Sequence, residues 1–280
     1  MNVNVRPSPI AGLWYEGDPK ALARSVDSYM DAAQNPALHG EVVGVVAPHA
    51  GHRYSGPVAG YAFAALRGMK PEVVAVLSPF HNYHGAPLLT TSHEAYGTPL
   101  GAVTVDRARV EGLSMAVKTE VGFGVTAIAN DPEHSLEIEL PFLQRALASE
   151  WQLLPLMVRV QEADVCRVLG RALAHVLEGK KAILVASTDL SHYYEQQTAV
   201  ALDRAMLEPV EAFDPGRTFD VERSGRGYAC GLGALAAVMW AAHEMGADHV
   251  EILRHATSGD VTGDYGAVVG YGAAAFVKSQ

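Results

Sequence analysis

Residues 42–52 read Val-Val-Gly-Val-Val-Ala-Pro-His-Ala-Gly-His, a short apolar run rich in β-branched side chains that stops at a proline. Such a run is typical of a fully buried strand, and the strand ends at the proline because proline cannot donate to a strand ladder. His49 therefore follows the carboxyl end of a buried strand, where open α/β sheets hold their ligands. This stretch predicts both the fold class and the location of a functional site.

The same pattern occurs twice more along the chain. The apolar run at 73–78 is followed closely by His81, and the run at 182–187 is followed by His192. One histidine at a strand end is common, whereas three buried strands that each deliver one predict a shared site. Histidine serves both as a metal ligand and as an acid–base group near neutral pH, and we favour a metal site here.

Apolar runs and helical repeats alternate over most of the chain. Strands are expected at 42–47, 73–78, 153–158, 182–187, 250–254 and 267–277, and helices at 19–30, 57–67, 131–148, 164–177, 196–222 and 231–245. The segment 88–105 reads as an antiparallel excursion with turns. The expected fold class is α/β, with a single domain spanning 1–280 and a mainly parallel or mixed central sheet flanked by helices.

Prolines mark three of the expected helices. Pro19 follows a helix-capping aspartate and fits the first helical position. Pro57 is expected to open the helix at 57–67 in the same way. Pro141 lies inside the helix expected at 131–148, where leucines recur at helical spacing, and is expected to kink that helix.

Composition and charge exclude several classes of function. The formal net charge is −10 with scattered acidic residues, whereas a nucleic-acid-binding face needs clustered basic ones. We find neither a signal peptide nor an uninterrupted apolar run of 18 residues, and the glycine motifs of nucleotide-binding loops are absent. Two cysteines cannot form a disulfide framework. We therefore expect a cytoplasmic protein with reduced thiols and no nucleic-acid or membrane partner.

His49 and His81 are the first candidates for metal ligands, because a neutral imidazole suits iron, copper, zinc or nickel. Each could instead be a strand-end histidine bonded to the backbone. Asp189 and His192 are three residues apart and would share a face on the first turn of a helix. One could be a ligand while the other transfers protons, or Asp189 could orient a histidine or simply cap the helix.

Cys230 precedes the buried helix expected at 231–245. A helix N-terminus and a nearby metal both lower the pKa of a thiol, which makes Cys230 a candidate ligand. A buried cysteine also packs like a small hydrophobic residue, and we interpret Cys166 in this way. A metal-free catalyst that pairs Cys230 with His49 or His192 is the remaining alternative.

Three further histidines lie close to these candidates in the sequence. His134 is expected at the start of the helix at 131–148, where it could act as a proton shuttle, contact a substrate, or lie on the surface. His52 and His84 are near the ligand candidates and could line the mouth of the site.

Several motifs together resemble the Memo family. They are, in chain order, Val5-Arg6-Pro7, Gly12-Leu13-Trp14-Tyr15, Pro48-His49-Ala50-Gly51, Tyr54-Ser55-Gly56, Ser78-Pro79-Phe80-His81, Glu133-His134-Ser135-Leu136-Glu137, Leu140-Pro141-Phe142, Ser187-Thr188-Asp189-Leu190-Ser191-His192-Tyr193 and Ala229-Cys230-Gly231. The resemblance runs from about residue 5 to residue 277. Bacterial and archaeal members of this family are often called the B component of the AmmeMemoRadiSam system, which implies a functional link to the other proteins of that system.

The resemblance also implies a fold and a metal site. The Memo fold is similar to that of class III extradiol ring-cleaving dioxygenases, which hold non-haem Fe(II) with two histidines and a carboxylate. By resemblance, His49, His81 and Cys230 are the metal ligands, with Asp189 and His192 beside them. Fe(II) is then the first expectation, copper becomes competitive because a thiolate replaces the carboxylate, and zinc comes third.

Two functional hypotheses follow from the sequence. The first is an Fe(II)-dependent, dioxygenase-like oxidoreductase that acts on a small molecule, such as an aromatic one, with His192 and Asp189 as catalytic groups and His134 as a proton shuttle. The second is a non-catalytic protein that binds copper or iron, or that holds a peptide or protein in its cleft.

Overall fold

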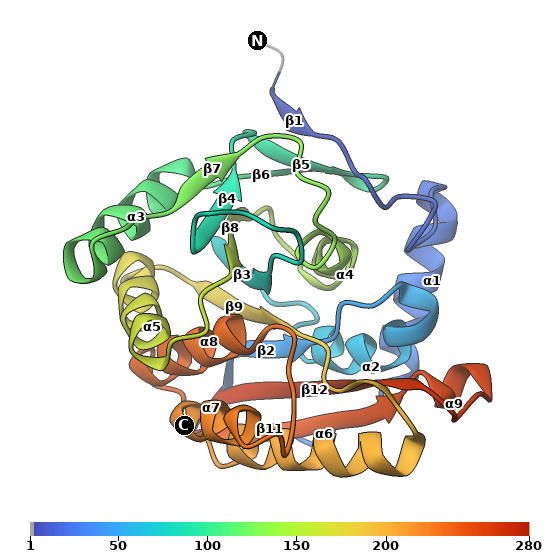
Figure 1. Cartoon of the computed structure of the whole chain (residues 1–280). Helices are drawn as coiled ribbons and strands as arrows, with labels where there is room; N and C mark the ends of the chain where they lie inside the picture. The colour runs from blue at the N-terminus through green and yellow to red at the C-terminus, as the bar shows by residue number, and fades with distance from the viewer. Residues whose placement is uncertain (1–2, 280) are drawn as a thin grey trace.

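The computed structural model describes residues 3–279 (Figure 1). Its strands are β1 (Val5–Arg6), β2 (Glu41–Ala47), β3 (Val73–Pro79), β4 (Leu88–Thr91), β5 (Ala95–Thr98), β6 (Gly101–Thr104), β7 (Thr126–Ile128), β8 (Gln152–Val158), β9 (Ala182–Ser187), β10 (His192–Tyr194), β11 (His249–Thr257) and β12 (Val268–Lys278). Its helices are α1 (Pro19–Ala32), α2 (His52–Ala64), α3 (Arg107–Val121), the 3-10 helix η1 (Glu137–Glu139), α4 (Leu140–Ala146), α5 (Ala163–Leu177), α6 (Gln196–Glu211), α7 (Pro215–Arg223), α8 (Leu232–Glu244) and α9 (Gly259–Thr262).

Most strands belong to one large sheet. Its order is β10-β12-β2-β9-β3-β8-β4-β7, with β11 paired to β12 outside this path. The central strands β2, β9, β3 and β8 are parallel, whereas β12 is antiparallel to β2 and β4 is antiparallel to β8. The α/β class with a mixed central sheet, as expected from the sequence, is confirmed.

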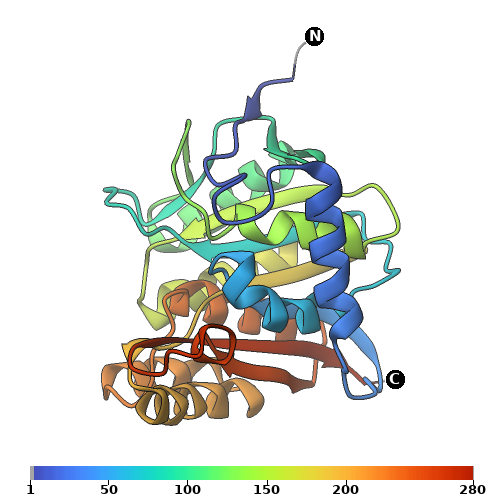
Figure 2. The same ribbon diagram turned by 90° about the vertical axis from the view of Figure 1, so that its right-hand side faces the viewer.

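Helices cover both faces of this sheet. In Figure 1, α3, α5 and α8 lie on one side, while α1, α2 and α4 lie on the other. Figure 2 views the molecule from the side of α1 and α2 and shows the long β11–β12 hairpin along one edge. Within residues 3–279, no helix has the length and apolar character needed to cross a lipid bilayer.

The parallel central strands bring the expected site residues to one edge. Ala47 of β2 pairs with Ser187 of β9, and Leu77 of β3 pairs with Ala186 of the same strand. The carboxyl ends of β2, β9 and β3 therefore meet, although the segments are far apart in the sequence. The prediction that these three strand ends share one edge is confirmed.

Helix α2 begins at His52, so the expectation that Pro57 opens it is wrong. An added Cβ at Gly56 would lie 2.6 Å from the Tyr29 ring, and one at Gly60 would lie 2.4 Å from the Tyr29 carbonyl oxygen. These glycines let α1 approach closely. This packing stabilises the helix on both sides of the proline and compensates for the missing backbone hydrogen bond.

The single kinked helix expected at 131–148 is also wrong. Residues up to Leu136 are not helical, η1 follows, and Pro141 lies in the first turn of α4, where its missing N–H costs nothing. The polar side chains of the first residues bind groups elsewhere in the fold instead of continuing a helix. His134 therefore lies in a loop rather than on a helix.

A buried arginine holds this loop. Arg6 of β1 is only 1% exposed. Its guanidinium donates to both carboxylate oxygens of Asp131 at 2.9 and 2.8 Å, to Glu137 Oε2 at 2.5 Å, and to the Glu133 carbonyl at 2.7 Å. The Tyr96 ring lies 4.9 Å from the guanidinium carbon. Arg6 thus ties β1 to the segment that carries Glu133 and His134.

The other expected helices agree with the structure within a few residues. The segment 196–222, where helices were expected, forms α6 and α7. Asp214 caps α7 by accepting a hydrogen bond from the Arg217 amide at 3.1 Å, and Pro215 follows at the first position. A capping aspartate followed by proline is a strong start signal, which explains the break.

We expect Arg6→Leu to destabilise the protein by about 3–5 kcal/mol, because it leaves Asp131 and Glu137 buried without their cation. Urea unfolding followed by circular dichroism measures this loss. The matched control is Arg67→Leu, since Arg67 forms an exposed ion pair with Asp31 and should change stability by about 0–1 kcal/mol. Equal effects of the two substitutions would contradict the role given to Arg6.

Candidate metal centre

Three histidines converge at the carboxyl edge of the sheet. One potential ligand atom from each of His49, His81 and His134 lies within 4.8 Å of the others. His49 follows β2, His81 follows β3, and His134 comes from the loop held by Arg6. The structure therefore adds His134 to the two histidines that the sequence placed first, and this set lies close enough together to share one metal ion.

His49 is buried and held on three sides. Its backbone amide donates to Asp189 Oδ1 at 2.7 Å, and its ring Nδ1 lies 2.9 Å from Ser187 Oγ. Its Nε2 lies 3.2 Å from Cys230 Sγ. Because Nδ1 is engaged by Ser187, Nε2 is the ring atom available to a metal. A metal-binding imidazole commonly has its second nitrogen bonded in this way.

Glu133 performs the same task for His81. Its Oε2 accepts the His81 amide at 2.6 Å, and its Oε1 lies 3.0 Å from His81 Nδ1. Glu133 Oε1 also accepts the amides of His134 and Ser135 at 2.9 and 3.0 Å. One buried carboxylate thus orients His81 and fixes the loop that carries His134.

His134 is stacked on the ring of His81 and lies against the tilted ring of Trp14. Its ring lies 4.8 Å from that of His81 at an interplanar angle of 12°, and 4.1 Å from that of Trp14. Both contacts restrict rotation of the imidazole. The His134 side chain is 19% exposed, so it is neither an ordinary surface residue nor fully buried.

Asp189 and Cys230 are hydrogen-bonded to each other through the backbone of Asp189. The Cys230 amide donates to the Asp189 carbonyl at 3.2 Å, and the Asp189 amide lies 3.2 Å from Cys230 Sγ. Cys230 lies next to His49 but outside the set of three histidines. Asp189 uses Oδ1 to hold the His49 amide, which is the orienting role that the sequence offered as one alternative.

The helix expected to begin with Asp189 and His192 does not form. Leu190 donates to the Gly270 carbonyl at 2.9 Å, and the Gly270 amide donates to Ser191 at 2.8 Å. These bonds tie the loop to β12, and His192 begins the short strand β10 instead. Burial, followed by the charge of His81, lowers the pKa of His192.

The histidines differ in protonation. Burial, reinforced by the charges of His81 and His134, lowers the pKa of His49 far below its ordinary value. Burial also lowers the pKa of His134 to about 4. Burial alone would lower the pKa of His81 too, but the hydrogen bond and charge of Glu133 outweigh it and raise that pKa. His49 and His134 are therefore neutral at pH 7, as a metal ligand must be.

The expectation of a lowered thiol pKa at Cys230 is wrong for the metal-free protein. Burial is the largest cause, and with the charge of Asp189 it raises the pKa of Cys230 well above its ordinary value. The helix N-terminus does not outweigh this desolvation. Burial also raises the pKa of Asp189, to about 7.

His52 and His84, which we expected could line the mouth of the site, are both bonded to the backbone. His52 is buried in α2, with Nε2 2.9 Å from the Ile138 carbonyl. His84 Nδ1 accepts the Ala86 amide at 3.0 Å within its own loop. Cys166 is fully buried in α5, in agreement with a packing role.

A cavity of about 590 Å³ adjoins the centre. Ala50, which follows His49, lines it, as does Trp14, whose ring lies against that of His134. Its other walls include the aromatic rings of Tyr54, Tyr193 and Tyr271. The cavity is large enough for a small organic molecule, and its walls combine these aromatic rings with polar side chains such as Arg53 and Asp264.

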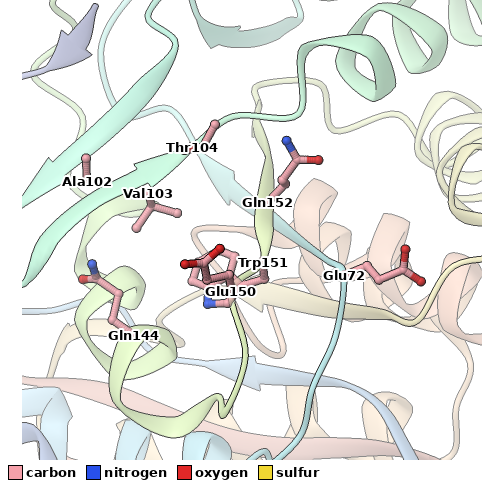
Figure 3. A pocket seen from close by; sticks show the side chains of 8 residues that line it. All are labelled: Glu72, Ala102, Val103, Thr104, Gln144, Glu150, Trp151 and Gln152. Atoms are coloured by element: carbon pink, nitrogen blue, oxygen red, sulfur yellow. The ribbon is translucent and has the colours of Figure 1, made fainter. Parts of the chain in front are cut away.

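A second cavity of similar size, about 610 Å³, lies elsewhere (Figure 3). It is lined by residues that precede or begin β3 and β8, namely Glu72, Glu150, Trp151 and Gln152, together with β6 and Gln144 of α4. These positions lie at the amino ends of the parallel strands, opposite the histidine cluster. This second cavity is therefore separate from the candidate centre.

A family model described as "Memo-like protein" matches residues 6–275. The chain belongs to the Memo family. MEMO1 family proteins of Nitrosopumilus maritimus and Pyrobaculum aerophilum are each 34% identical to it, over 98% and 99% of this chain and the full length of both relatives. Among solved structures, an uncharacterized protein of Escherichia coli K12 is similar at 14% identity and a TM-score of 0.43, over 73% of this chain and 86% of that one.

Sequence reasoning missed three residues that orient the histidines of this Memo family member. They are Glu133, Ser187 and Trp14, which contact His81, His49 and His134 respectively. Ser187 ends the strand that precedes Asp189, and Glu133 adjoins His134, so their positions beside candidate residues were the available signal. Nothing in the sequence alone pairs Trp14 with a histidine more than a hundred residues away.

The acid sensitivity of the fold follows in part from His52. Burial lowers the pKa of His52 from 6.5 to about 4. The folded state thus binds this proton less readily, so the contribution of His52 to stability is complete above pH 6.5 and falls as the pH drops toward 4. We expect His52→Gln, which keeps a donor for the Ile138 carbonyl, to remove up to about 3 kcal/mol of this pH dependence.

Urea unfolding at pH 7.5 and pH 4.5 measures the effect of His52→Gln. His175→Gln is the matched control, because His175 is exposed at the end of α5. A wild-type protein and a His52→Gln variant with parallel pH profiles would contradict a neutral, buried His52.

Proposed function

We propose that this protein binds one transition-metal ion at the carboxyl edge of its sheet and uses it as a non-haem iron-dependent, dioxygenase-like oxidoreductase. The observation that carries the proposal is the pair His49 and His81, whose Nδ1 atoms are both engaged by neighbouring side chains while Nε2 is left for a metal. Imidazole nitrogens suit Fe(II), copper and zinc alike.

The donor atoms fit such an ion. We propose His49, His81 and Cys230 as ligands, in agreement with the family resemblance, and His134 as a further donor from the three-histidine cluster. Imidazoles and one sulfur make a site of intermediate softness, so we propose Fe(II) first, copper second and zinc third. Asp189 acts as a positioning residue, because its Oδ1 already holds the His49 amide.

The chain's own residues would supply binding and proton transfer. The cavity beside Trp14, which Tyr54, Tyr193 and Tyr271 also line, would hold a small, aromatic substrate next to the ion. His192 is half-buried, and burial and the charge of His81 lower its pKa, so it would be neutral at pH 7 and would act first as a general base. The bound ion would supply one-electron and oxygen chemistry.

The alternative is a non-catalytic copper or iron carrier, or a peptide-binding protein that uses the same cavity. The position of Cys230 Sγ, 3.2 Å from His49 Nε2, favours Cu(I) binding in particular, because sulfur is a soft donor. A functional link to the other AmmeMemoRadiSam proteins is compatible with both the catalytic and the non-catalytic proposal.

We expect His49→Ala and His81→Ala each to lose stoichiometric metal without unfolding the protein, since each removes a ligand that follows a strand end. Asp189→Asn should weaken binding by about 10–100-fold, as positioning residues do. Anaerobic Fe(II) titration with elemental analysis measures both effects, and His175→Ala is the matched surface control. Retention of metal by both alanine variants would place the site elsewhere.

The same titration, repeated with Cu(I), separates His134 from Cys230. We expect Cys230→Ser to weaken Cu(I) more than Fe(II), and His134→Ala to weaken Fe(II) more than Cu(I), because sulfur is the softer donor. If His134→Ala leaves both affinities unchanged, His134 is a proton shuttle or substrate contact and not a ligand.

The catalytic proposal predicts oxygen consumption by the Fe(II)-loaded protein in the presence of a catechol. We expect His192→Ala to keep its iron and to lose turnover by about 10²–10⁴-fold, the usual contribution of a general acid–base. An oxygen electrode measures the rate, and elemental analysis measures the iron. Tight Cu(I) binding without turnover of any aromatic tested would favour the carrier.

A further inference from the structure

The hydroxyl of Ser187 has more partners than it has protons. Its Oγ lies 2.9 Å from His49 Nδ1, 2.7 Å from the Ser135 carbonyl oxygen, and 2.7 Å from Glu139 Oε1. A serine hydroxyl offers one proton and two acceptor lone pairs. Ser187 can donate its proton to only one of these three groups, and the other two groups must donate a hydrogen bond to Ser187 Oγ.

The Ser135 carbonyl resolves the assignment, because a carbonyl can only accept. Ser187 must therefore donate to Ser135, and both His49 and Glu139 must donate to Ser187. His49 then carries its proton on Nδ1. Glu139 can donate only if its carboxyl group is protonated, so this count requires a neutral carboxylic acid.

The surroundings of Glu139 agree with the neutral form. The side chain is 1% exposed, and among the described residues its Oε2 has no hydrogen-bond partner. An ionised carboxylate with one bare oxygen would be very costly in such a place, whereas the carbonyl oxygen of an acid costs far less. Burial, supported by the charge of Asp189, raises the pKa of Glu139 well above its ordinary value.

We propose that Glu139 is a positioning residue that remains protonated, donates to Ser187, and thereby locks His49 in the Nδ1–H tautomer with Nε2 free. The protonation of Glu139 and the tautomer of His49 do not depend on the proposed metal function. Only their purpose, which is to present Nε2 as a ligand atom, rests on it. The chain thus uses two kinds of carboxyl group for two histidines: an ionised one, Glu133, for His81 and a neutral one, Glu139, for His49.

Infrared difference spectroscopy on the metal-free protein tests the protonation directly. Wild type minus Glu139→Gln should show the C=O stretch of a carboxylic acid at neutral pH, with no lost carboxylate band. Glutamine keeps the size of the side chain and can donate to Ser187, so the variant should fold normally. A lost carboxylate band instead would overturn the proposal.

Nitrogen NMR of the histidine rings tests the tautomer. The His49 ring signals are identified as those that are missing from the spectrum of His49→Gln. Wild type and Glu139→Gln should both show protonated Nδ1 and unprotonated Nε2 at His49. Ser187→Ala, which removes the acceptor, should populate the other tautomer. A wild-type protein with protonated Nε2, or a Ser187→Ala variant unchanged from wild type, would contradict the assignment.

Fe(II) titration then links the tautomer to binding. We expect Glu139→Gln to bind within a few-fold of wild type and Ser187→Ala to lose about 10–100-fold. Because the infrared and NMR measurements need no metal, they can succeed when the metal proposal fails. If the infrared and NMR spectra are as expected but Ser187→Ala binds Fe(II) as tightly as wild type, the tautomer does not serve metal binding. That result would overturn this part of the inference.

Discussion

The parallel pairing of β2, β9 and β3 is the constraint on which the rest of the structure depends. Backbone hydrogen bonds in this ladder fix Ala47, Ser187 and Leu77 near one edge of the sheet. His49, Asp189 and His81 follow those positions, so their proximity costs no further ordering of the chain. The candidate centre is in this sense a consequence of strand order, with loops adding the remaining residues.

The loop from Asp131 to Glu139 supplies what the strands cannot. It delivers His134 to the cluster, Glu133 to His81 and Glu139 to Ser187. Such a segment would be expensive to bury with its charges unpaired. Arg6 of β1 pairs with the carboxylates of Asp131 and Glu137 in this loop. A residue that is distant from the histidines in the sequence therefore helps to determine where the loop lies.

Two buried glutamates of this loop behave oppositely because their partners differ. Glu133 receives amides from His81, His134 and Ser135, and these donors, with the charge of His81, lower its pKa despite burial. Glu139 meets one hydroxyl and leaves an oxygen without a partner. For these two glutamates, which are both almost fully buried, the difference lies in the donors and charges that reach each carboxyl group.

The sequence by itself determined the apolar strands, the helices with clear caps, and the histidines at the strand ends, because periodicity and strand termination are local properties. It also indicated the family, through motifs spread over the chain. Only the tertiary structure decided that 131–139 is not a long helix and that Asp189 lies in a loop, since both depend on distant partners, Arg6 and Gly270. The protonation of Cys230 and Glu139 was beyond the sequence for the same reason: desolvation and hydrogen-bond partners exist only in the folded chain.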